Sequence, residues 1–314
     1  MSRPYESGLQ EIGDGLYAYL QPDGSWGWSN AGLIADGEST LLVDTLYDLH
    51  LTERMLGEMR RAVPAAARID TLVNTHANGD HCYGNSLVQG ARIVASERTA
   101  AEMPELPPAA MAALVEQAPQ MGELGAFFLR CFGAFDFAGI ELALPQDTFT
   151  GELTIHVGAR EVRLIEVGPA HTRGDTLALL ARERVLFSGD ILFNGAHPIA
   201  WAGPISNWIA ACERILAMDV EVIVPGHGPL AGKHDVRELK AYFEYLYEQA
   251  RALHAEGMTA LEAARSIALE RWADWGEGER LVVNIASIYR ELAGSPEPAS
   301  PLEAFQQMAE LACD

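Results

Sequence analysis

The sequence predicts a layered α/β fold with two helical additions. Short apolar segments that are typical of strands alternate with helix-like segments along most of the chain. This alternation is the pattern of strands and helices packed in layers. The pattern becomes helical between Thr99 and about Phe137, and again after Gly232. We therefore expect one α/β domain over residues 1–234, with a helical insertion at about 99–137, and a helical C-terminal extension over residues 235–314.

The part of the chain before the insertion begins with a predicted hairpin. Its connection, PDGSWGWSN at residues 22–30, contains a Pro-Asp-Gly sequence that favours a turn. The two hairpin strands are expected at 15–21 and 31–37, followed by a short buried strand at 39–45. A helix is expected at about 49–63, and two further strands at 69–75 and 91–96.

The part of the chain after the insertion contains five more predicted strands and then helices. The strands are expected at 153–158, 160–168, 176–182, 184–190 and 220–226. A helix over 236–257 should stop at Gly257, and TALE at residues 259–262 is a capping-box sequence that predicts the start of the next helix. One apolar face of the first of these helices predicts packing against the core or against a second subunit, so a homodimer is a possible assembly.

The composition is that of an ordinary globular protein and disfavours anionic partners. Of 314 residues, 49% are hydrophobic, and 44 acidic residues oppose 22 basic ones to give a net charge of −22. This charge repels nucleic acid and anionic membrane surfaces, so we expect neither as a partner. The first residues lack the features of a secretory signal, and no later segment approaches the length of a membrane-spanning helix. We expect a cytoplasmic protein.

The four cysteines are scattered and form no C-x-x-C pair. They are Cys82, Cys131, Cys212 and Cys313. This spacing indicates neither a disulfide framework nor a thiolate zinc cluster, and buried reduced thiols are the expected state.

Histidines and aspartates collect where predicted strands end. The segment NTHANGDHCYGN places two histidines, an asparagine and an aspartate within six residues, and similar positions recur in GPAHTRGDT, LFSGDILF and VPGHGP. The residues are His76, Asn78, Asp80, His81, His171, Asp190 and His227. Strand ends in a layered sheet can converge at one edge, so we expect these side chains to meet. Imidazoles and carboxylates gathered in this way suit zinc, iron or manganese.

This pattern resembles the metallo-β-lactamase superfamily of hydrolases over residues 8–232. The family pattern His-x-His-x-Asp-His, then a His, a bridging Asp and a last His, is matched here by HANGDH, His171, Asp190 and His227. The resemblance implies a four-layer αβ/βα sandwich with metals at the sheet edges, and a catalytic role for residues 1–234. It implies one metal site formed by His76, position 78, His171 and Asp190, and a second formed by Asp80, His81, Asp190 and His227. It also places Asp44 where the family supports the ligand shell, although a loop cap is an equal interpretation.

Asn78 stands where the family pattern has its second histidine. An amide oxygen is a harder and weaker ligand than an imidazole nitrogen, so we expect the first site to bind zinc less tightly while tolerating manganese or iron. The expected cofactor is zinc, with one tight site and a second that is weak or occupied by manganese or iron. Loss of activity is the alternative interpretation of Asn78.

The chemistry implied by this ligand set is hydrolysis. A metal lowers the pKa of bound water towards about 7 and so provides a hydroxide, with Asp80 and Asp190 as catalytic residues that orient it and handle a proton. We expect an ester, lactone, thioester or amide substrate with an apolar acyl part. One alternative is a non-haem Fe(II) dioxygenase of the persulfide dioxygenase type, since His76, His171 and Asp190 form a two-His, one-carboxylate set. Another is a non-catalytic protein that binds a ligand in the same pocket.

Residues near the predicted metal loops are candidates for binding the substrate. Trp26 and Trp28 lie in the hairpin connection, where the family often has a flap, although such a hairpin could also be buried under a helix. His197 and Trp201 follow Asp190 in the loop NGAHPIAWAGPISNW. His197 could donate to a substrate oxyanion or satisfy its own loop. The Met and Phe residues of the insertion suit either a lid or core packing, and Thr75, Asn85 and Thr172 are interpreted as turn residues.

Overall fold

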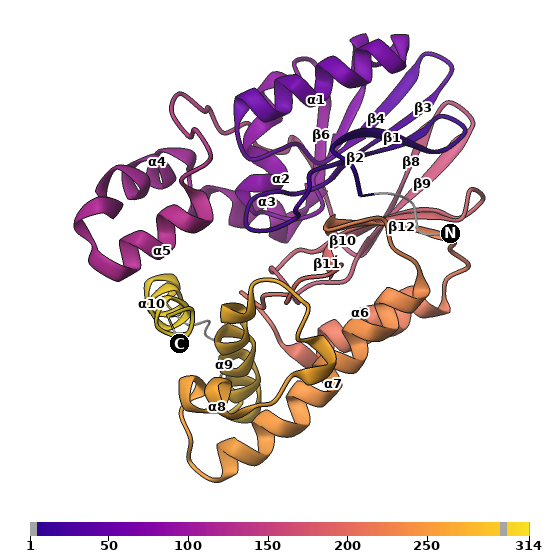
Figure 1. Ribbon diagram of the computed structural model, residues 1–314. Helices are drawn as coiled ribbons and strands as arrows, with labels where there is room; N and C mark the ends of the chain where they lie inside the picture. The colour runs from indigo at the N-terminus through magenta and orange to yellow at the C-terminus, as the bar shows by residue number, and fades with distance from the viewer. Residues whose placement is uncertain (1–4, 296–299, 314) are drawn as a thin grey trace.

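Two β-sheets packed face to face form the centre of the protein, with helices on both outer sides (Figure 1). The computed structural model describes residues 5–295 and 300–313. The inner faces of both sheets share one apolar core that includes Val43, Val73, Leu164 and Phe187. Helix α1 (Leu49–Ala62) packs on the outer face of the first sheet, and α6 (Ile205–Ala217) and α7 (Lys233–Ala255) cover the second. The predicted four-layer αβ/βα sandwich is confirmed.

The first sheet has seven strands in sequence order. They are β1 (Gly8–Gly13), β2 (Leu16–Leu20), β3 (Ala31–Asp36), β4 (Ser39–Val43), β5 (Thr71–Val73), β6 (Arg92–Ser96) and β7 (Asp147–Phe149). The strands β1 to β4 are antiparallel, and β4 to β7 are parallel. The predicted hairpin is confirmed as the antiparallel pair of β2 and β3. Two strands escaped prediction: β7 has only three residues, and β1 is a partly exposed edge strand without a clear apolar alternation.

The second sheet has five strands in the order β12-β11-β10-β9-β8. They are β8 (Glu152–Val157), β9 (Arg160–Glu166), β10 (Thr176–Leu180), β11 (Val185–Phe193) and β12 (Val222–His227). All five were predicted, but β11 continues three residues past Asp190, where the sequence pattern placed its end. The pairing of β11 with β12 shifts register around Gly189, so the strand is irregular where Asp190 leaves it.

Helix α1 forms where the apolar spacing and an acidic cap agree. The side chain of Asp48 accepts a hydrogen bond from the backbone N–H of Leu51 at 2.7 Å, which satisfies a free donor of the first turn. Met55, Leu56 and Met59 lie on the buried face. The helix stops one residue before the predicted end, because Val63 has an extended backbone conformation.

The segment predicted to be an insertion is helical. It contains α3 (Glu97–Glu102), α4 (Pro108–Gln117) and α5 (Gly122–Phe132), and α2 (Gly79–Cys82) is a single turn in the histidine-rich loop. Its aromatic residues are mostly buried in the larger core, among them Phe127, Phe128 and Phe132. Short 3₁₀ turns join these and other elements, namely η1 (Pro64–Ala67), η2 (Tyr83–Leu87), η3 (Met103–Glu105), η4 (Ala118–Gln120), η5 (Glu270–Trp272) and η6 (Gly278–Arg280).

The C-terminal extension is also helical and reaches back to the insertion. Beyond α7 it contains α8 (Ala260–Ser266), α9 (Leu281–Leu292) and α10 (Pro301–Leu311). The predicted capping box is confirmed, since Thr259 and Glu262 exchange side-chain to backbone hydrogen bonds at 2.8 and 3.3 Å. Helix α10, drawn in yellow, lies against α5 of the insertion (Figure 1). This contact brings two segments together that are far apart in the sequence.

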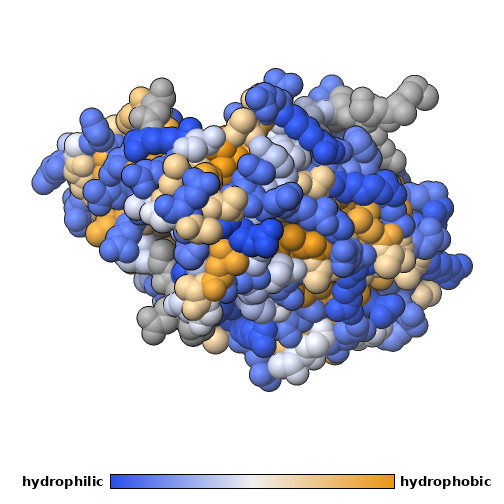
Figure 2. Space-filling model, turned by 90° about the horizontal axis from the view of Figure 1, so that it is seen from below, coloured by the Kyte–Doolittle hydropathy of each residue, from blue (hydrophilic) through white to orange (hydrophobic). Residues whose placement is uncertain are grey.

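The face of the protein seen in Figure 2 is mainly hydrophilic, with hydrophobic residues scattered between the hydrophilic ones. Within the described residues, no helix is both long and apolar enough to cross a lipid bilayer.

Candidate metal centre

The predicted ligands come from four segments of the chain that meet at the same edge of the two sheets. His76, Asn78, Asp80 and His81 follow β5, and the last two lie in the single turn of α2. His171 lies between β9 and β10, Asp190 within β11, and His227 at the end of β12. Gly226 is required beside Asp190, because a Cβ atom at residue 226 would overlap Oδ1 of the Asp190 carboxylate.

The structure brings six of the seven predicted residues into two adjoining groups. His76, His171 and Asp190 form one group, and Asp80, His81 and His227 form the other, with the ligand atoms of each group within 4.8 Å of one another. Asp190 joins the groups, because its Oδ2 lies 3.2 Å from Nε2 of His171 and its Oδ1 lies 3.1 Å from Nε2 of His81. Asp80 Oδ2 lies 3.2 Å from Nε2 of His227.

Each of the four imidazoles is oriented by an acceptor at its Nδ1 atom. The Nδ1 atoms of His171 and His227 lie 2.7 and 3.0 Å from the carbonyl oxygens of Ile199 and Gly24. A carbonyl can only accept, so these Nδ1 atoms carry the proton and the Nε2 atoms keep a lone pair. Phe193 stacks on His227 with the rings 5.2 Å apart and 6° from parallel.

The other two imidazoles are held through Asp44. Its Oδ2 lies 3.0 Å from Nδ1 of His81 and accepts the hydroxyl proton of Thr75, whose oxygen lies 3.0 Å from Nδ1 of His76. Support of metal-binding imidazoles by a carboxylate or hydroxyl at the second nitrogen fixes the tautomer and the ring orientation. Asp44 therefore orients both rings, and Thr75 takes part in this support although its sequence context suggested only a turn.

The convergence leaves buried polar atoms without partners. Among the described residues, Nε2 of His76, Nε2 of His81 and Oδ1 of Asp190 are buried and make no hydrogen bond of acceptable geometry, although the last two atoms lie 3.1 Å apart. An unpaired buried lone pair is costly, and native proteins rarely leave several side by side. A cation placed among these atoms would satisfy all three, so the residues present fit a divalent metal.

The charge state of the group also suits a cation. Burial lowers the pKa of His76 and His171, which keeps both imidazoles neutral. Burial alone would raise the pKa of Asp190, but the surrounding imidazoles outweigh it and hold that pKa well below its usual range. Burial likewise opposes a charge on His81, but Asp190 and Asp80 raise its pKa well above the usual value. A bound metal would replace the proton that these carboxylates draw to His81.

Asn78 reaches the first group through its amide. Its Nδ2 atom lies 3.0 Å from Nε2 of His171, and the residue is the N-terminal cap position of α2. The two ends of an amide have nearly the same shape, so rotation of the terminal group would present its oxygen at the same place. Position 78 therefore faces the group that the resemblance assigned to it.

A further buried carboxylate shapes the His171 loop. Asp175 accepts hydrogen bonds from the backbone N–H of Thr172, the Thr172 hydroxyl and the backbone N–H of Ala170, at 2.7 to 3.2 Å. Burial raises the pKa of Asp175 to about 8, against the hydrogen bonds from Thr172 that lower it. Asp175 was not among the residues predicted from the sequence, although an aspartate four residues after a candidate ligand is one sign of such a turn.

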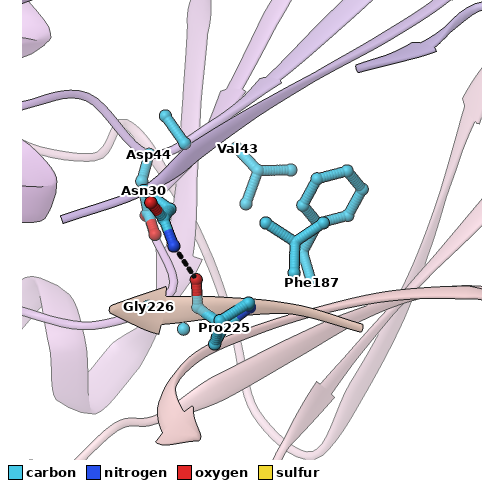
Figure 3. Close-up of a pocket in the computed structure, with 9 residues that line it drawn as sticks. Asn30, Val43, Asp44, Phe187, Pro225 and Gly226 are labelled. Carbon is cyan, nitrogen blue, oxygen red and sulfur yellow. Dashed lines mark hydrogen bonds between the residues drawn. The ribbon is translucent and has the colours of Figure 1, made fainter. Parts of the chain in front are cut away.

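The cavity behind the ligand loops is too small for a substrate. It has a volume of about 10 Å³ and lies between the sheets, beside Val43, Asp44, Phe187 and Gly226 (Figure 3). Asn30 closes one side by donating to the carbonyl oxygen of Pro225 at 3.0 Å. A space of this size holds at most about one water, so it belongs to the packing between the sheets and cannot take a substrate.

The family of the chain follows from its sequence and agrees with this geometry. Residues 24–227, more than half of the chain, match the sequence profile described as the Metallo-beta-lactamase superfamily. The chain belongs to this superfamily. The match contains every candidate ligand, from His76 to His227.

Three relatives show the range of this superfamily. The 2,4-dinitroanisole O-demethylase subunit alpha of Nocardioides sp. (strain JS1661) is 32% identical over 40% of this chain and 37% of its own length. An acyl-coenzyme A thioesterase of Gallus gallus, MBLAC2, is 26% identical over 37% of this chain and 42% of its own length. The linear primary-alkylsulfatase of Pseudomonas sp. (strain ATCC 19151) is 22% identical over 76% of this chain and 49% of its own length. The chain thus spans less than half of each of these relatives.

Among solved structures, the fold is shared with an inverting sec-alkylsulfatase. Pisa1 from Pseudomonas sp. superposes with a TM-score of 0.66 at 18% identity, covering 97% of this chain and 54% of that one. The metallo-beta-lactamase from Pontibacter korlensis has a TM-score of 0.57 at 18% identity, covering 76% of this chain and 99% of that one. The alkylsulfatase match extends over nearly the whole chain, the C-terminal helices included.

The residues predicted to bind substrate lie in different surroundings in this superfamily member. Trp26 and Trp201 are partly buried and pack against each other, with ring centres 6.4 Å apart. Trp28 is also partly buried and packs on Phe135 of the insertion at 4.9 Å. The insertion therefore contacts the hairpin connection, and Trp28 is partly covered by it.

His197 faces the C-terminal helices. Its ring packs against Tyr242 and Trp275, and its Nδ1 lies 3.2 Å from the Tyr242 hydroxyl. Among the described residues, none of its ring contacts or hydrogen bonds involves a ligand of the candidate metal centre. The structure therefore favours the interpretation in which His197 satisfies its own surroundings.

Proposed function

We propose that this protein is a metal-dependent hydrolase that cleaves an ester, lactone, thioester or amide with an apolar acyl part. The observation that carries the proposal is the convergence of four imidazole Nε2 atoms and two carboxylates on a buried space, where three of these atoms make no hydrogen bond within the described part of the chain. A bound divalent metal would supply Lewis acidity and a water of lowered pKa at neutral pH.

The residues of the two groups would hold the metal in two neighbouring sites. His76, Asn78, His171 and Asp190 would form the first site, and Asp80, His81, Asp190 and His227 the second. We propose zinc as the metal of the tight site. The first site has the amide of Asn78 in place of the imidazole of the superfamily pattern, so it would be the weaker one and could hold manganese or iron.

The two carboxylates would orient the water and move the proton. Asp80 is 8% exposed and Asp190 is 3% exposed, so Asp80 is the carboxylate more accessible to a leaving group. Burial raises the pKa of Asp80, but His81 and His227 outweigh it and lower that pKa to about 2, which keeps the carboxylate ionised and able to orient the water. Asp190 lies between both groups and would mainly fix their separation.

The substrate class rests on the aromatic residues beside the metal loops. Trp26 and Trp201 offer partly exposed apolar surface, which favours an apolar group over a charged one. Two relatives have names that refer to an acyl or an alkyl group, the acyl-coenzyme A thioesterase and the linear primary-alkylsulfatase. Both names are compatible with hydrolysis at the end of an aliphatic chain.

One observation supports a second candidate function. His76, His171 and Asp190 alone form a two-His, one-carboxylate group, the arrangement of non-haem Fe(II) oxygenases. Such an enzyme would need only this group, whereas the hydrolase would also use Asp80, His81 and His227.

The two functions are separated by metal exchange and one substitution. Metal-free protein would be loaded with Zn(II), Mn(II) or Fe(II) and supplied, without oxygen, with aryl esters, lactones and thioesters of increasing acyl length. The hydrolase requires activity with zinc or manganese, loss of that activity in Asp190→Ala, and loss in His227→Ala. Activity that needs iron and oxygen, and that survives His227→Ala, would support the oxygenase. Inactivity with every metal and substrate would reject both and favour a ligand-binding protein.

A further inference from the structure

Three partly buried aromatic rings from distant parts of the chain meet at one place. Trp26 lies in the connection between β2 and β3, Trp201 follows β11, and Phe305 belongs to α10 of the C-terminal extension. Their ring centres are 5.8 to 6.4 Å apart in all three pairs, and Trp201 and Phe305 are stacked at 26°. We call these residues the aromatic triad.

The triad is linked to the candidate metal centre, because the loops that carry both tryptophans are hydrogen-bonded to ligand residues. The carbonyl oxygen of Gly24, two residues before Trp26, accepts from Nδ1 of His227 at 3.0 Å. On one side of Trp201, the carbonyl oxygen of Ile199 accepts a hydrogen bond from Nδ1 of His171 at 2.7 Å. On the other side, the backbone N–H of Ala202 donates to the carbonyl oxygen of His171 at 3.1 Å. Each tryptophan is therefore within two residues of a contact with a metal-ligand candidate.

The triad is held in place by the C-terminal extension and the insertion. Glu279 accepts a hydrogen bond from Nε1 of Trp26 at 2.9 Å, and the Arg280 guanidinium lies 4.1 Å from the centre of the same ring. Behind the triad, Phe132 is buried and lies 5.7 Å from Trp26 and 5.8 Å from Phe305. Rings fixed in this way lose little conformational entropy when a ligand binds to them.

We propose that Phe305 is a specificity-determining residue, and that the aromatic triad binds the aliphatic chain of the substrate beside the metal centre. This proposal rests on the proposed hydrolase function and adds the place of the apolar part. Phe305 lies outside residues 24–227, so the C-terminal extension supplies one side of the binding site that the superfamily match does not include. Each of the three rings keeps part of its apolar surface exposed, and an alkyl chain packed over that surface would leave water.

The test measures binding without hydrolysis. Hexanol, octanol and decanol have no scissile bond, and their binding to the metal-free and zinc-loaded full chain can be followed by calorimetry or tryptophan fluorescence. Affinity should rise by up to roughly fourfold per methylene until the chain exceeds the site. Phe305→Ala should weaken decanol binding about tenfold, because one side of the site is lost, and should weaken hexanol binding less.

Two further variants separate this role from a general effect on α10. Leu302 is 59% exposed on the same helix, so Leu302→Ala should leave alkanol binding unchanged. Phe305→Leu keeps an apolar side chain and should recover most of the affinity. If Phe305→Ala fails to fold, Phe305→Leu decides the question, because its smaller side chain should still weaken decanol binding by roughly twofold, and affinity equal to that of the parent would overturn the role of Phe305.

The outcomes distinguish this proposal from the proposed function. Length-dependent alkanol binding that is weakened in Phe305→Ala supports the triad even if no substrate is hydrolysed. If the parent, Phe305→Ala and Phe305→Leu all hydrolyse the substrates, and their KM values are equal to one another at each acyl length, the role of Phe305 is overturned and the hydrolase function stands. Equal weakening by Leu302→Ala and Phe305→Ala would also overturn it, because the effect would then belong to the helix as a whole.

Discussion

The Oδ2 atom of Asp44 lies 3.0 Å from Nδ1 of His81, on the side of the imidazole that faces away from Asp190. Asp44 adopts a left-handed backbone conformation with φ of 62°, which is uncommon outside glycine. The other carboxylate oxygen accepts the backbone N–H of Thr75 at 2.7 Å. One strained residue thus fixes the orientation of ligands on both sides of the candidate metal centre.

Replacing this carboxylate should weaken metal binding. Asp44→Asn keeps the size of the side chain, and asparagine tolerates the left-handed conformation, but the charge that orients His81 is lost. We expect zinc affinity to fall by roughly 10- to 100-fold. Competition with a chelating dye would measure it. Asp147→Asn removes an exposed carboxylate on β7 and serves as the control. Equal affinity in the parent and Asp44→Asn would reject the support role.

Position 78 should set the occupancy of the first site. The parent protein should keep one tightly bound metal through dialysis, because an amide is a weaker ligand than an imidazole. Asn78→His adds that imidazole beside His171 and should bring the retained zinc close to two equivalents. Elemental analysis of both proteins measures this. Two full equivalents of zinc in the parent would show that Asn78 does not weaken the site.

The hairpin tryptophans should contribute binding rather than chemistry. Trp26→Ala combined with Trp28→Ala removes apolar contacts that are similar in the ground state and the transition state. We expect KM for an apolar substrate to rise by roughly tenfold, with a smaller fall in kcat. Steady-state kinetics on a short and a long acyl substrate would show it. Kinetics indistinguishable from the parent would assign the apolar contacts to the insertion instead.

His197 should make stability depend on pH. Burial, together with the nearby Arg280, lowers the pKa of His197 from 6.5 to about 4. The unfolded chain therefore takes up a proton near pH 6.5, while the folded chain does so only near pH 4. The stability contributed by the neutral ring is present above about pH 6.5 and is lost as the pH falls to about 4.

The size of this effect can be isolated with one variant. The loss should be on the order of 3 kcal/mol over that range, and it should be missing in His197→Gln. Urea unfolding of the metal-free parent and of metal-free His197→Gln at several pH values gives the difference between their free energies of unfolding. The ligand histidines titrate in both proteins, so their effect cancels in this difference. Parallel curves for the two proteins would mean that His197 titrates normally.

The ligand positions could be predicted from the sequence because they follow strands. His76 and His81 follow the apolar run of β5, and His227 ends the run of β12 between Gly226 and Gly228, where the strands end at the sheet edge. The pattern placed the end of β11 at Asp190, but the strand continues to Phe193. Local apolar runs show that a strand is present more clearly than where it ends.

The other parts of the site depend on contacts that no local pattern contains. Thr75 supports His76 only because Asp44, 31 residues earlier, lies within hydrogen-bonding distance. Phe305 reaches Trp26 because α10 packs on α5. The spacing of residues within α10 predicts an apolar face but gives no information on what that face contacts.

The source of the oxygen in the product tests the account most directly. Zinc-loaded protein would be incubated with a substrate that it cleaves, in oxygen-18-enriched water from which dissolved oxygen has been removed. The masses of the products would then be measured by mass spectrometry. The metal centre proposed here predicts one labelled oxygen per cleavage event, and no cleavage by metal-free protein or by Asp190→Ala. Product that forms only with iron and dissolved oxygen, and carries its oxygen atom from that gas, would contradict the hydrolase.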